Sequence, residues 1–277
     1  MTEIGPAMPS SAAKSAERAF DVLQLLAAQG HALSTAEITA ACGIPKSSAH
    51  QLLNAMHRRG FVRYREAERL WELGDAVLDL AASYRRSDTL QVKAGPILAT
   101  LAGEVGCTAH LAVLRGTEVL YLDKRESRAA GIQLVTEIGV RLPACYSAVG
   151  QAILAFMPVE AVDELYVDYS FDAARGGGPT DVGALHSRLE DVRLRGVSHD
   201  SGMVTAGVSC IAAPVFTSQG PAGAVGVSFI SAQRDHDEIA VIEQTVADAA
   251  AHLTREVNGL SAGSPTELRP GAAREPR

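Results

Sequence analysis

The chain has 277 residues and a formal net charge of −7, with 47% hydrophobic and 21% charged residues. This composition supplies enough apolar material for a folded core and excludes a wholly disordered protein. The length suits one large domain or two ordinary ones. The longest charge-poor stretch, residues 202–234, contains Pro214 and Pro221. It is therefore interpreted as two strands and a turn, and not as a membrane-spanning helix.

The termini and the cysteines indicate a cytoplasmic protein. The first residues, MTEIGPAMPSSAAKS, lack the apolar segment of a secretory signal. The cysteines lie far apart and form no C-x-x-C pair, which favours a reducing compartment over a disulfide framework or a zinc cluster; they are Cys42, Cys107, Cys145 and Cys210. We expect no metal, no cofactor and no membrane association.

The charge is unevenly distributed along the chain. Residues 1–90 hold ten basic and ten acidic side chains, so the excess of acid lies in residues 91–277. The segment 46–69 carries six basic residues and only two acidic ones. A local positive charge of this kind favours contact with nucleic acid despite the negative total.

The first 73 residues of the chain predict a winged helix-turn-helix. Apolar residues at helical spacing predict a helix over 16–30, and Ser34-Thr35 with Glu37 resembles the N-cap of a short helix that stops at Cys42-Gly43. A second helix begins after Pro45 and repeats the apolar stripe to Gly60. Two strands, 61–64 and 69–73, flank a polar tip and form the wing.

The residues after the wing predict a linker and a second domain. Leu73, Val77, Leu80 and Tyr84 stand at coiled-coil-like spacing and indicate a helix that pairs with a second copy. Further helices are predicted over 89–105, 148–157, 159–166, 182–194 and 235–257. Strands are predicted over 110–114, 119–122, 132–135, 208–216 and 224–230. Strands that mostly form hairpins, with helices between them, indicate an α+β domain with an antiparallel sheet.

The expected domain plan follows from these elements. It comprises a disordered tail over 1–13, a winged helix-turn-helix over 14–73, a linker helix over 74–88, the α+β domain over 89–258 and a disordered tail over 259–277.

Several segments resemble one known family. The runs Glu17–Leu23, Gly43–Leu53 and Gly60–Val62 are similar to the DNA-binding domain of the isocitrate lyase regulator (IclR) family of bacterial transcription factors. The similarity continues, in order, through Trp71–Gly74, Gly106–Leu114, Tyr121–Lys124, Gly139–Pro143 and Gly207–Phe216. It implies a winged helix-turn-helix, a linker helix and a PAS/GAF-like effector domain, assembled as dimers or dimers of dimers.

The predicted DNA contacts lie on the second helix and the wing. A recognition helix needs a small polar first turn, hydrogen-bonding side chains and an apolar back. We expect Ser47, Ser48, His50, Gln51 and Asn54 to face the major groove of double-stranded operator DNA. We expect Lys46, Arg58, Arg63 and Arg65 to contact phosphates or, for the wing pair Arg63 and Arg65, the minor groove.

The resemblance also implies a pocket for a small organic or aromatic acid. The residues carried over are Tyr146, Ala148, Val149, Asp200, Cys210, Gly226 and Ser228, with Asp200 expected on a loop before the strands. Backbone N–H groups at a helix start, a hydroxyl and a thiol are all able to donate to a carboxylate. The chain departs from the family where Gly150-Gln151 replaces Gly-Lys and where the acidic cluster after Asp200 is reduced. Cys210, Asp200 and Ser228 are also compatible with purely structural roles.

Two other functions stay open at this point. His199-Asp200-Ser201 contains the residue types of a catalytic triad, but adjacent residues point apart and no nucleophile or nucleotide motif is present. His110, in an apolar strand, is interpreted as a hydrogen-bonded core residue. The main prediction is a ligand-responsive repressor and not an enzyme. The alternatives are a small-molecule enzyme with an accessory DNA-binding head and a scaffold that uses the winged domain for protein contacts.

Overall fold

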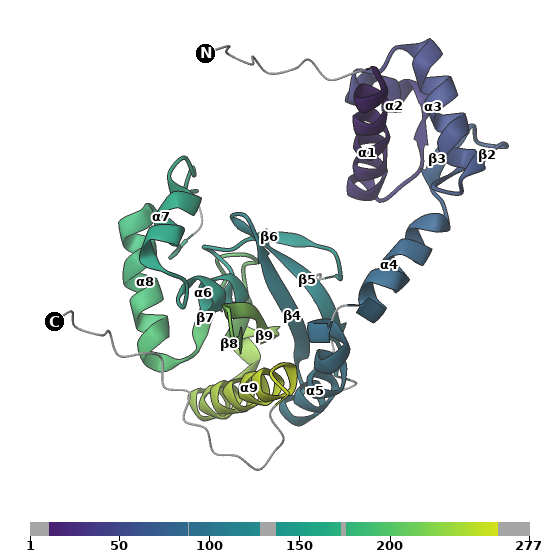
Figure 1. Ribbon diagram of the computed structural model, residues 1–277. Coiled ribbons are helices and arrows are strands. Elements are labelled where there is room, and N and C mark those ends of the chain that lie inside the picture. Colours follow the sequence, from purple (N-terminus) through teal and green to yellow (C-terminus); the bar gives the residue numbers. More distant parts are fainter. Residues whose placement is uncertain (1–10, 88, 128–136, 173–175, 260–277) are drawn as a thin grey trace. The chain divides into compact units, whose positions relative to one another are not determined.

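The computed structural model describes residues 11–87, 89–127, 137–172 and 176–259. The chain divides into two compact units, residues 1–87 and 88–277, which Figure 1 shows in purple to blue and in blue to yellow. The strand predicted over 132–135 lies outside the described residues. No helix in the described ranges combines the length and the apolar character needed to span a membrane.

The first unit is a set of helices with a small antiparallel sheet. Its elements are α1 (Ser11–Gln29), β1 (Leu33–Ser34), α2 (Thr35–Cys42), α3 (Lys46–Arg58), β2 (Val62–Arg65), β3 (Leu70–Leu73) and α4 (Ala76–Ser87). The strand order is β1-β3-β2, so the β2–β3 hairpin is the predicted wing. The two-residue strand β1 was not predicted, because two residues are too few to show a strand period.

Local sequence signals place the helix-turn-helix. Ser34 and Glu37 form the reciprocal capping box at the start of α2, and Gly43 ends that helix in the left-handed conformation at φ 60°. Both features confirm the predicted boundaries. The inward side chains Ala49, Leu53 and Met56 of α3 are buried, so the predicted apolar stripe anchors this helix in the core of the unit.

The second unit contains a six-stranded sheet in which every pair is antiparallel. Its strands are β4 (Thr108–Arg115), β5 (Glu118–Arg125), β6 (Arg141–Pro143), β7 (Ser198–Ser201), β8 (Val208–Thr217) and β9 (Gly220–Ile230), in the order β6-β5-β4-β9-β8-β7. Its helices are α5 (Thr89–Val105), α6 (Ala148–Leu154), α7 (Val159–Tyr166), α8 (Val182–Arg195) and α9 (His236–Val257), with a short 3-10 turn at Ser231–Gln233. The predicted α+β class is confirmed.

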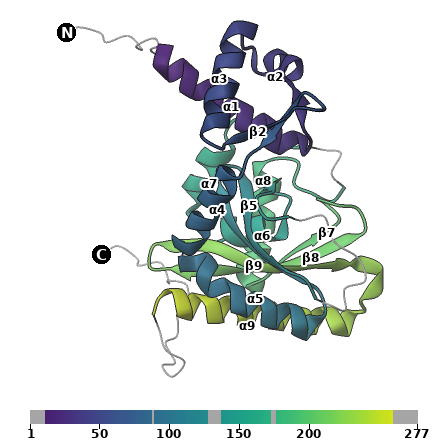
Figure 2. The same ribbon diagram turned by 90° about the vertical axis from the view of Figure 1, so that its right-hand side faces the viewer.

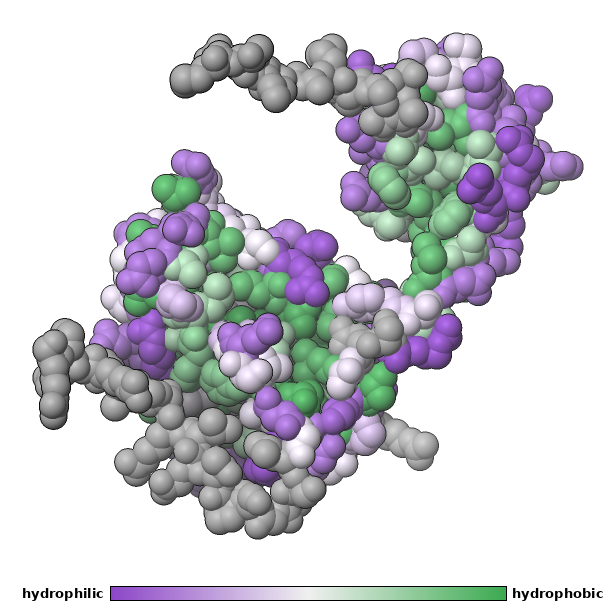
Figure 3. Space-filling view, viewed as in Figure 1, coloured by the Kyte–Doolittle hydropathy of each residue, from purple (hydrophilic) through white to green (hydrophobic). Residues whose placement is uncertain are grey.

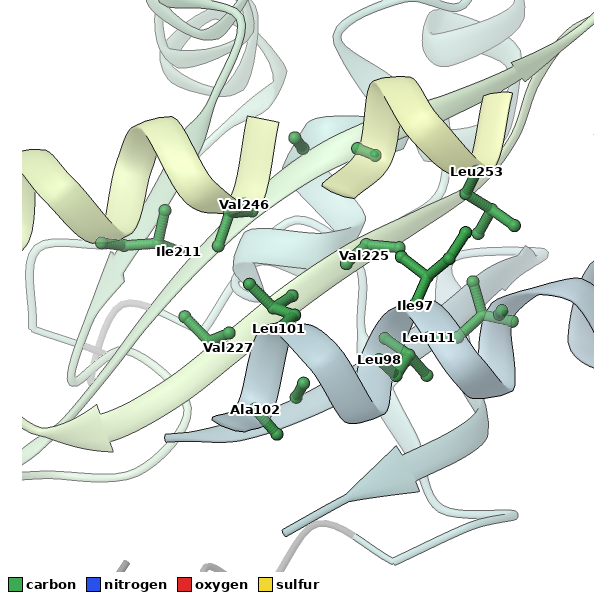
Figure 4. Packing of buried hydrophobic residues seen from close by; sticks show 14 of the residues in the cluster. Ile97, Leu98, Leu101, Ala102, Leu111, Ile211, Val225, Val227, Val246 and Leu253 are labelled. Atoms are coloured by element: carbon green, nitrogen blue, oxygen red, sulfur yellow. The ribbon is translucent and has the colours of Figure 1, made fainter. Parts of the chain in front are cut away.

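The two faces of this sheet are covered differently, and this difference positions the candidate site. Helices α5 and α9 pack on one face and α6 on the other, with α8 behind α6 (Figure 2). On the α5/α9 face, alternate strand residues such as Leu111, Ile211 and Val225 form a continuous apolar core with Leu98 and Leu253 (Figure 4). The core against α6 is also largely apolar, but it is interrupted by polar side chains at one end of the sheet.

The structure corrects several predicted elements. Asp200 lies on strand β7, where it pairs with Cys210 of β8, and not on a loop. The polar run Ser198–Ser201 shows no apolar alternation, because all four of its side chains are polar on both faces of the edge strand. Strand β6 was likewise not predicted, and α6 ends at Leu154, three residues before the predicted boundary.

Candidate functional site

Helix α3 presents a polar face to solvent. Its side chains at the predicted DNA contacts are exposed, with Ser48 partly exposed; these are Lys46, Ser47, Ser48, His50, Gln51, Asn54 and Arg58. Pro45 precedes the helix and provides no side-chain cap, so the first-turn N–H groups of α3 stay available to an anion. The face therefore combines hydrogen-bonding side chains with a helix N-terminus, which is what a duplex groove and its phosphates require.

Hydrogen bonds join α3 to the wing. The ring Nδ1 of His57, near the end of α3, lies 3.0 Å from the carbonyl oxygen of Val62 on β2. Trp71 on β3 is buried and its Nε1 donates to Thr35 Oγ1 at 2.9 Å. The wing and the helix-turn-helix are therefore held as one body, and His57 is used within the fold.

Both wing arginines are paired with Glu72, and Arg65 Nη1 also lies 3.1 Å from Glu68 Oε2. Arg63 Nε lies 2.7 Å from Glu72 Oε1, and Arg65 Nη2 lies 2.8 Å from Glu72 Oε2. The Glu72 pKa is lowered, first by the hydrogen bond from Arg65 and then by that from Arg63, and the same pairing raises the Arg65 pKa. The sequence did not predict this arrangement, which arises because Arg63 pairs directly with Glu72 across the hairpin. The wing is covered by hydrophilic residues (Figure 3).

A small cavity of about 30 Å³ lies between the sheet and α6 in the second unit. Polar and apolar side chains from all six strands, from the start of α6 and from the loop after β7 line it: His110, Tyr121, Leu142, Ser147, Ala148, Val149, Asp200, Val204, Thr205, Val208, Cys210 and Ser228. Among the residues that the structure describes, no lysine or arginine lines it. Five of the seven predicted effector contacts therefore meet around one enclosed space.

Strand register brings the polar residues together. Asp200 on β7 is opposite Cys210 on β8, and Cys210 is opposite Ser228 on β9. These positions lie in a row on the sheet face that α6 covers. Because each belongs to a different strand, their proximity follows from the sheet and not from any sequence spacing.

The polar row, Asp200, Cys210 and Ser228, forms hydrogen bonds within itself and to the backbone. Cys210 Sγ lies 2.9 Å from Ser228 Oγ, and Asp200 Oδ1 accepts a hydrogen bond from the Met203 N–H at 2.7 Å. Desolvation raises the Cys210 pKa to about 12, so the thiol is neutral and able to donate. Asp200 thus caps the turn after β7 and lines the cavity as well.

His110 on β4 lines the cavity, and its hydrogen bonding differs from the prediction. The side chain is 1% exposed, and neither ring nitrogen has a hydrogen-bond partner among the residues that the structure describes. Burial, and secondarily the charge of Lys124, lowers its pKa to about 4. The interpretation of His110 as a hydrogen-bonded core residue was wrong, because the apolar strand around it provides no partner.

The first turn of α6 is held close to the sheet and to the preceding loop. Ser147 caps the helix by accepting from the Gly150 N–H at 3.1 Å, and Ser198 on β7 donates to the Ala148 carbonyl. A Cβ at Gly150 would stand 2.2 Å from the Ala144 carbonyl oxygen, so only glycine fits there. Gln151, where the family has lysine, donates to the Cys145 carbonyl at 2.8 Å.

The structure places the other two predicted contacts outside the cavity lining. The Tyr146 hydroxyl accepts from the Asp172 N–H at 2.6 Å and donates to the Pro179 carbonyl at 3.3 Å. Gly226 lies beneath the His110 ring, where a Cβ would approach Nε2 to 3.1 Å. Gly226 therefore makes room for His110.

A wider groove of about 540 Å³ runs between α5 and α9, lined in part by Thr100, Glu104 and His252. It lies on the outer side of the helices, away from the polar row, and contains none of the predicted contacts. Within the described part of the chain, no cluster of three or more histidine, cysteine or acidic side chains has the arrangement of a metal site.

Comparisons with known proteins identify the family of each unit. Residues 82–255 match the family described as bacterial transcriptional regulator IclR C-terminal, and residues 15–66 match the IclR helix-turn-helix domain. The chain is 28% identical over 243 residues to the HTH-type transcriptional regulator XynR of Escherichia coli K12, covering 87% of this chain and 96% of XynR. It is 27% identical over 250 residues to the transcriptional repressor IclR of the same organism, covering 89% and 91%.

The fold matches solved structures as well. One is an IclR homologue from Microbacterium hydrocarbonoxydans complexed with 4-hydroxybenzoate, with a TM-score of 0.77, 22% identity, and coverage of 88% of this chain and 98% of that one. At this identity the likeness concerns the fold alone. Because the two family models together span both units, the chain belongs to the IclR family of bacterial transcriptional regulators.

Proposed function

We propose that the chain is a repressor that binds double-stranded operator DNA through its first unit and a small organic effector through its second. The observation that carries the sensing half is the enclosed cavity under α6, where polar groups from separate strands converge. A closed space lined by a few convergent polar groups on a largely apolar wall is typical of a small-molecule site. The assignment of repression is supported by the name of the relative IclR.

In this proposal α3 enters the major groove. Ser47, Ser48, His50, Gln51 and Asn54 read base edges, and Lys46 and Arg58 contact phosphates. Arg63 and Arg65 contact phosphates or the minor groove, for which they exchange part of their bonding to Glu72. The exchange is supported by the 60% and 48% exposure of the two arginine side chains, which leaves them accessible to a phosphate.

Helix α4 supports assembly as a homodimer or a dimer of dimers. It exposes Leu78 at 70%, Leu80 at 60% and Tyr84 at 44%, and burying a large apolar side chain contributes about 1.5–3 kcal/mol. Two copies joined through α4 would present two recognition helices to the half-sites of a palindromic operator.

The effector is proposed to be a small organic or aromatic acid-like compound. A cavity of about 30 Å³ has room for about one water molecule, so an effector must displace part of the wall. The loop after β7 supplies Val204 and Thr205 to that wall. Displacement of this loop would distinguish bound from free protein, and a ligand changes DNA affinity only if it binds one state better than the other.

The test is DNA binding by the purified full-length chain. The DNA is the region upstream of its own coding sequence, titrated with salt and with aliphatic and aromatic acids. Specific binding that weakens steeply with salt, because phosphate contacts release counterions, and that one compound reverses supports the proposal. Binding that no compound changes contradicts the sensing half, and absence of specific binding contradicts the DNA-binding half.

A further inference from the structure

The His110 side chain is a buried polar group of the cavity that forms no hydrogen bond with the residues that the structure describes. Its neighbours in the polar row bond to one another or to backbone: Cys210 to Ser228, and Asp200 to the Met203 N–H. The two His110 nitrogens have no such partner among the described residues, although the ring is fully enclosed. An unpartnered buried polar group destabilises a fold, so its presence requires an explanation.

Packing does not provide that explanation. The His110 ring lies 5.2 Å from the Tyr121 ring, with the two planes inclined at 59°. A phenylalanine at position 110 would make the same ring contact without burying two polar atoms. Gly226 directly below the ring leaves space for it, because a Cβ there would approach His110 Nε2 to 3.1 Å and the Ile211 carbonyl oxygen to 3.0 Å. The site is therefore shaped around an imidazole whose nitrogens are left for another molecule.

The protonation state of His110 limits which chemical group that molecule presents. With a pKa lowered to about 4 by burial and by Lys124, the ring is neutral at physiological pH. A neutral imidazole has one N–H donor and one acceptor nitrogen. A carboxylate bonds only to the N–H nitrogen and an ammonium only to the bare nitrogen, whereas a hydroxyl group is able to bond to whichever nitrogen it faces, because it both donates and accepts. The nearby Ser228 hydroxyl and Cys210 thiol are able to complete its hydrogen bonds.

We propose that His110 is the specificity-determining contact of the effector site and that it selects an effector bearing a hydroxyl group, phenolic or aliphatic. This inference rests on the proposed ligand sensing and narrows its ligand class. An acid group elsewhere on the effector is compatible with it, since the proposal concerns the part of the ligand that lies over β4. The effector is thus a hydroxy acid or a phenolic acid, and its analogue without the hydroxyl binds weakly.

Matched pairs of probes test the selection. The pairs are 4-hydroxybenzoate with benzoate and lactate with propionate, measured by calorimetry on the full-length chain at millimolar concentrations. One additional hydrogen-bonded group changes a dissociation constant by about tenfold. The wild-type chain is expected to bind the hydroxyl member of a pair about tenfold more tightly. His110→Phe is expected to bind both members alike, and His110→Gln, which keeps one donor and one acceptor, is expected to retain the preference.

Two further observations distinguish a direct contact between His110 and the effector from a structural role of His110. His252→Phe, at a half-exposed site on α9, is the control and should leave the preference unchanged. The ¹⁵N resonances of the His110 ring should shift when the hydroxyl probe binds. They should not shift when the matched probe without the hydroxyl group binds. The inference is overturned if the wild-type chain binds the two probes of a pair with equal affinity, or if His110→Phe still prefers the hydroxyl probe. Either result would leave the proposal of ligand binding itself intact. Binding of no probe to the wild-type chain contradicts the proposed ligand sensing itself.

Discussion

Acidification should destabilise the second unit through His110, and His110→Phe should remove this effect. The pKa of the buried ring is about 4 in the folded chain, against an ordinary value of 6.5. Below pH 6.5 the unfolded chain therefore binds a proton that the folded chain does not, and stability falls as the pH decreases. The loss grows between pH 6.5 and 4 and reaches about 3 kcal/mol, since one pKa unit corresponds to about 1.4 kcal/mol. At pH 5 it amounts to about 2 kcal/mol.

The assay is urea unfolding of the wild-type chain and of His110→Phe at pH 8 and pH 5, followed by far-UV circular dichroism. Other groups also titrate in this range, so the decisive quantity is the difference between the two pH dependences. The single tryptophan, Trp71, lies in the first unit, and its fluorescence transition is an internal control that should be the same in both chains. If the two chains lose equal stability on acidification, His110 is not a buried neutral group in the folded chain.

Three other predictions follow from the described contacts. Gln51→Ala should relax base preference at one operator position and weaken specific binding by about 1–3 kcal/mol, as measured by competition between operator variants. Arg63→Ala should weaken binding to all DNA sequences alike and reduce the slope of affinity against salt by about one contact. Gly150→Ala should lower the unfolding midpoint of the second unit, because its Cβ would meet the Ala144 carbonyl at 2.2 Å. Gly103→Ala, where the Cβ meets nothing within 4 Å, is the matched control and should stabilise α5 by about 0.5–1 kcal/mol.

Each of these predictions has a distinct opposing result. An unchanged base preference in Gln51→Ala would remove the proposed reading role. A loss confined to the specific site in Arg63→Ala would contradict a phosphate contact, and so would an unchanged salt slope. Equal unfolding midpoints for Gly150→Ala and Gly103→Ala would show that α6 is free to move away from the Ala144 loop.

Local signals explain why the helices were predictable. The bounds of α5 and α7 match the predictions residue for residue, and the Ser34 cap and Gly43 stop define α2. Caps, apolar periods and helix-ending glycines act within a few residues, so they can be identified along the sequence. The short strands β1, β6 and β7 could not be identified in this way, because each is defined by pairing with a distant strand.

The sequence predicted which residues line the cavity better than it predicted their contacts. The resemblance to the family selected Asp200, Cys210 and Ser228, and the structure brings these three together through the β7–β8–β9 register. The state of His110 depends on what surrounds a side chain in three dimensions, and an apolar strand in the sequence indicates only that the residue is buried. The Glu72 pairing of the wing arginines is likewise a consequence of hairpin register.

We propose that effector binding to the second unit and operator binding to the first unit are coupled. The most direct measurement is the operator dissociation constant with and without saturating hydroxyl-bearing effector, together with the effector dissociation constant with and without operator. Coupling between two binding sites is reciprocal. Both constants should change by the same factor, and His110→Phe should reduce the affinity of the chain for the effector. An operator dissociation constant that is identical with and without saturating effector would show that the two sites are not coupled.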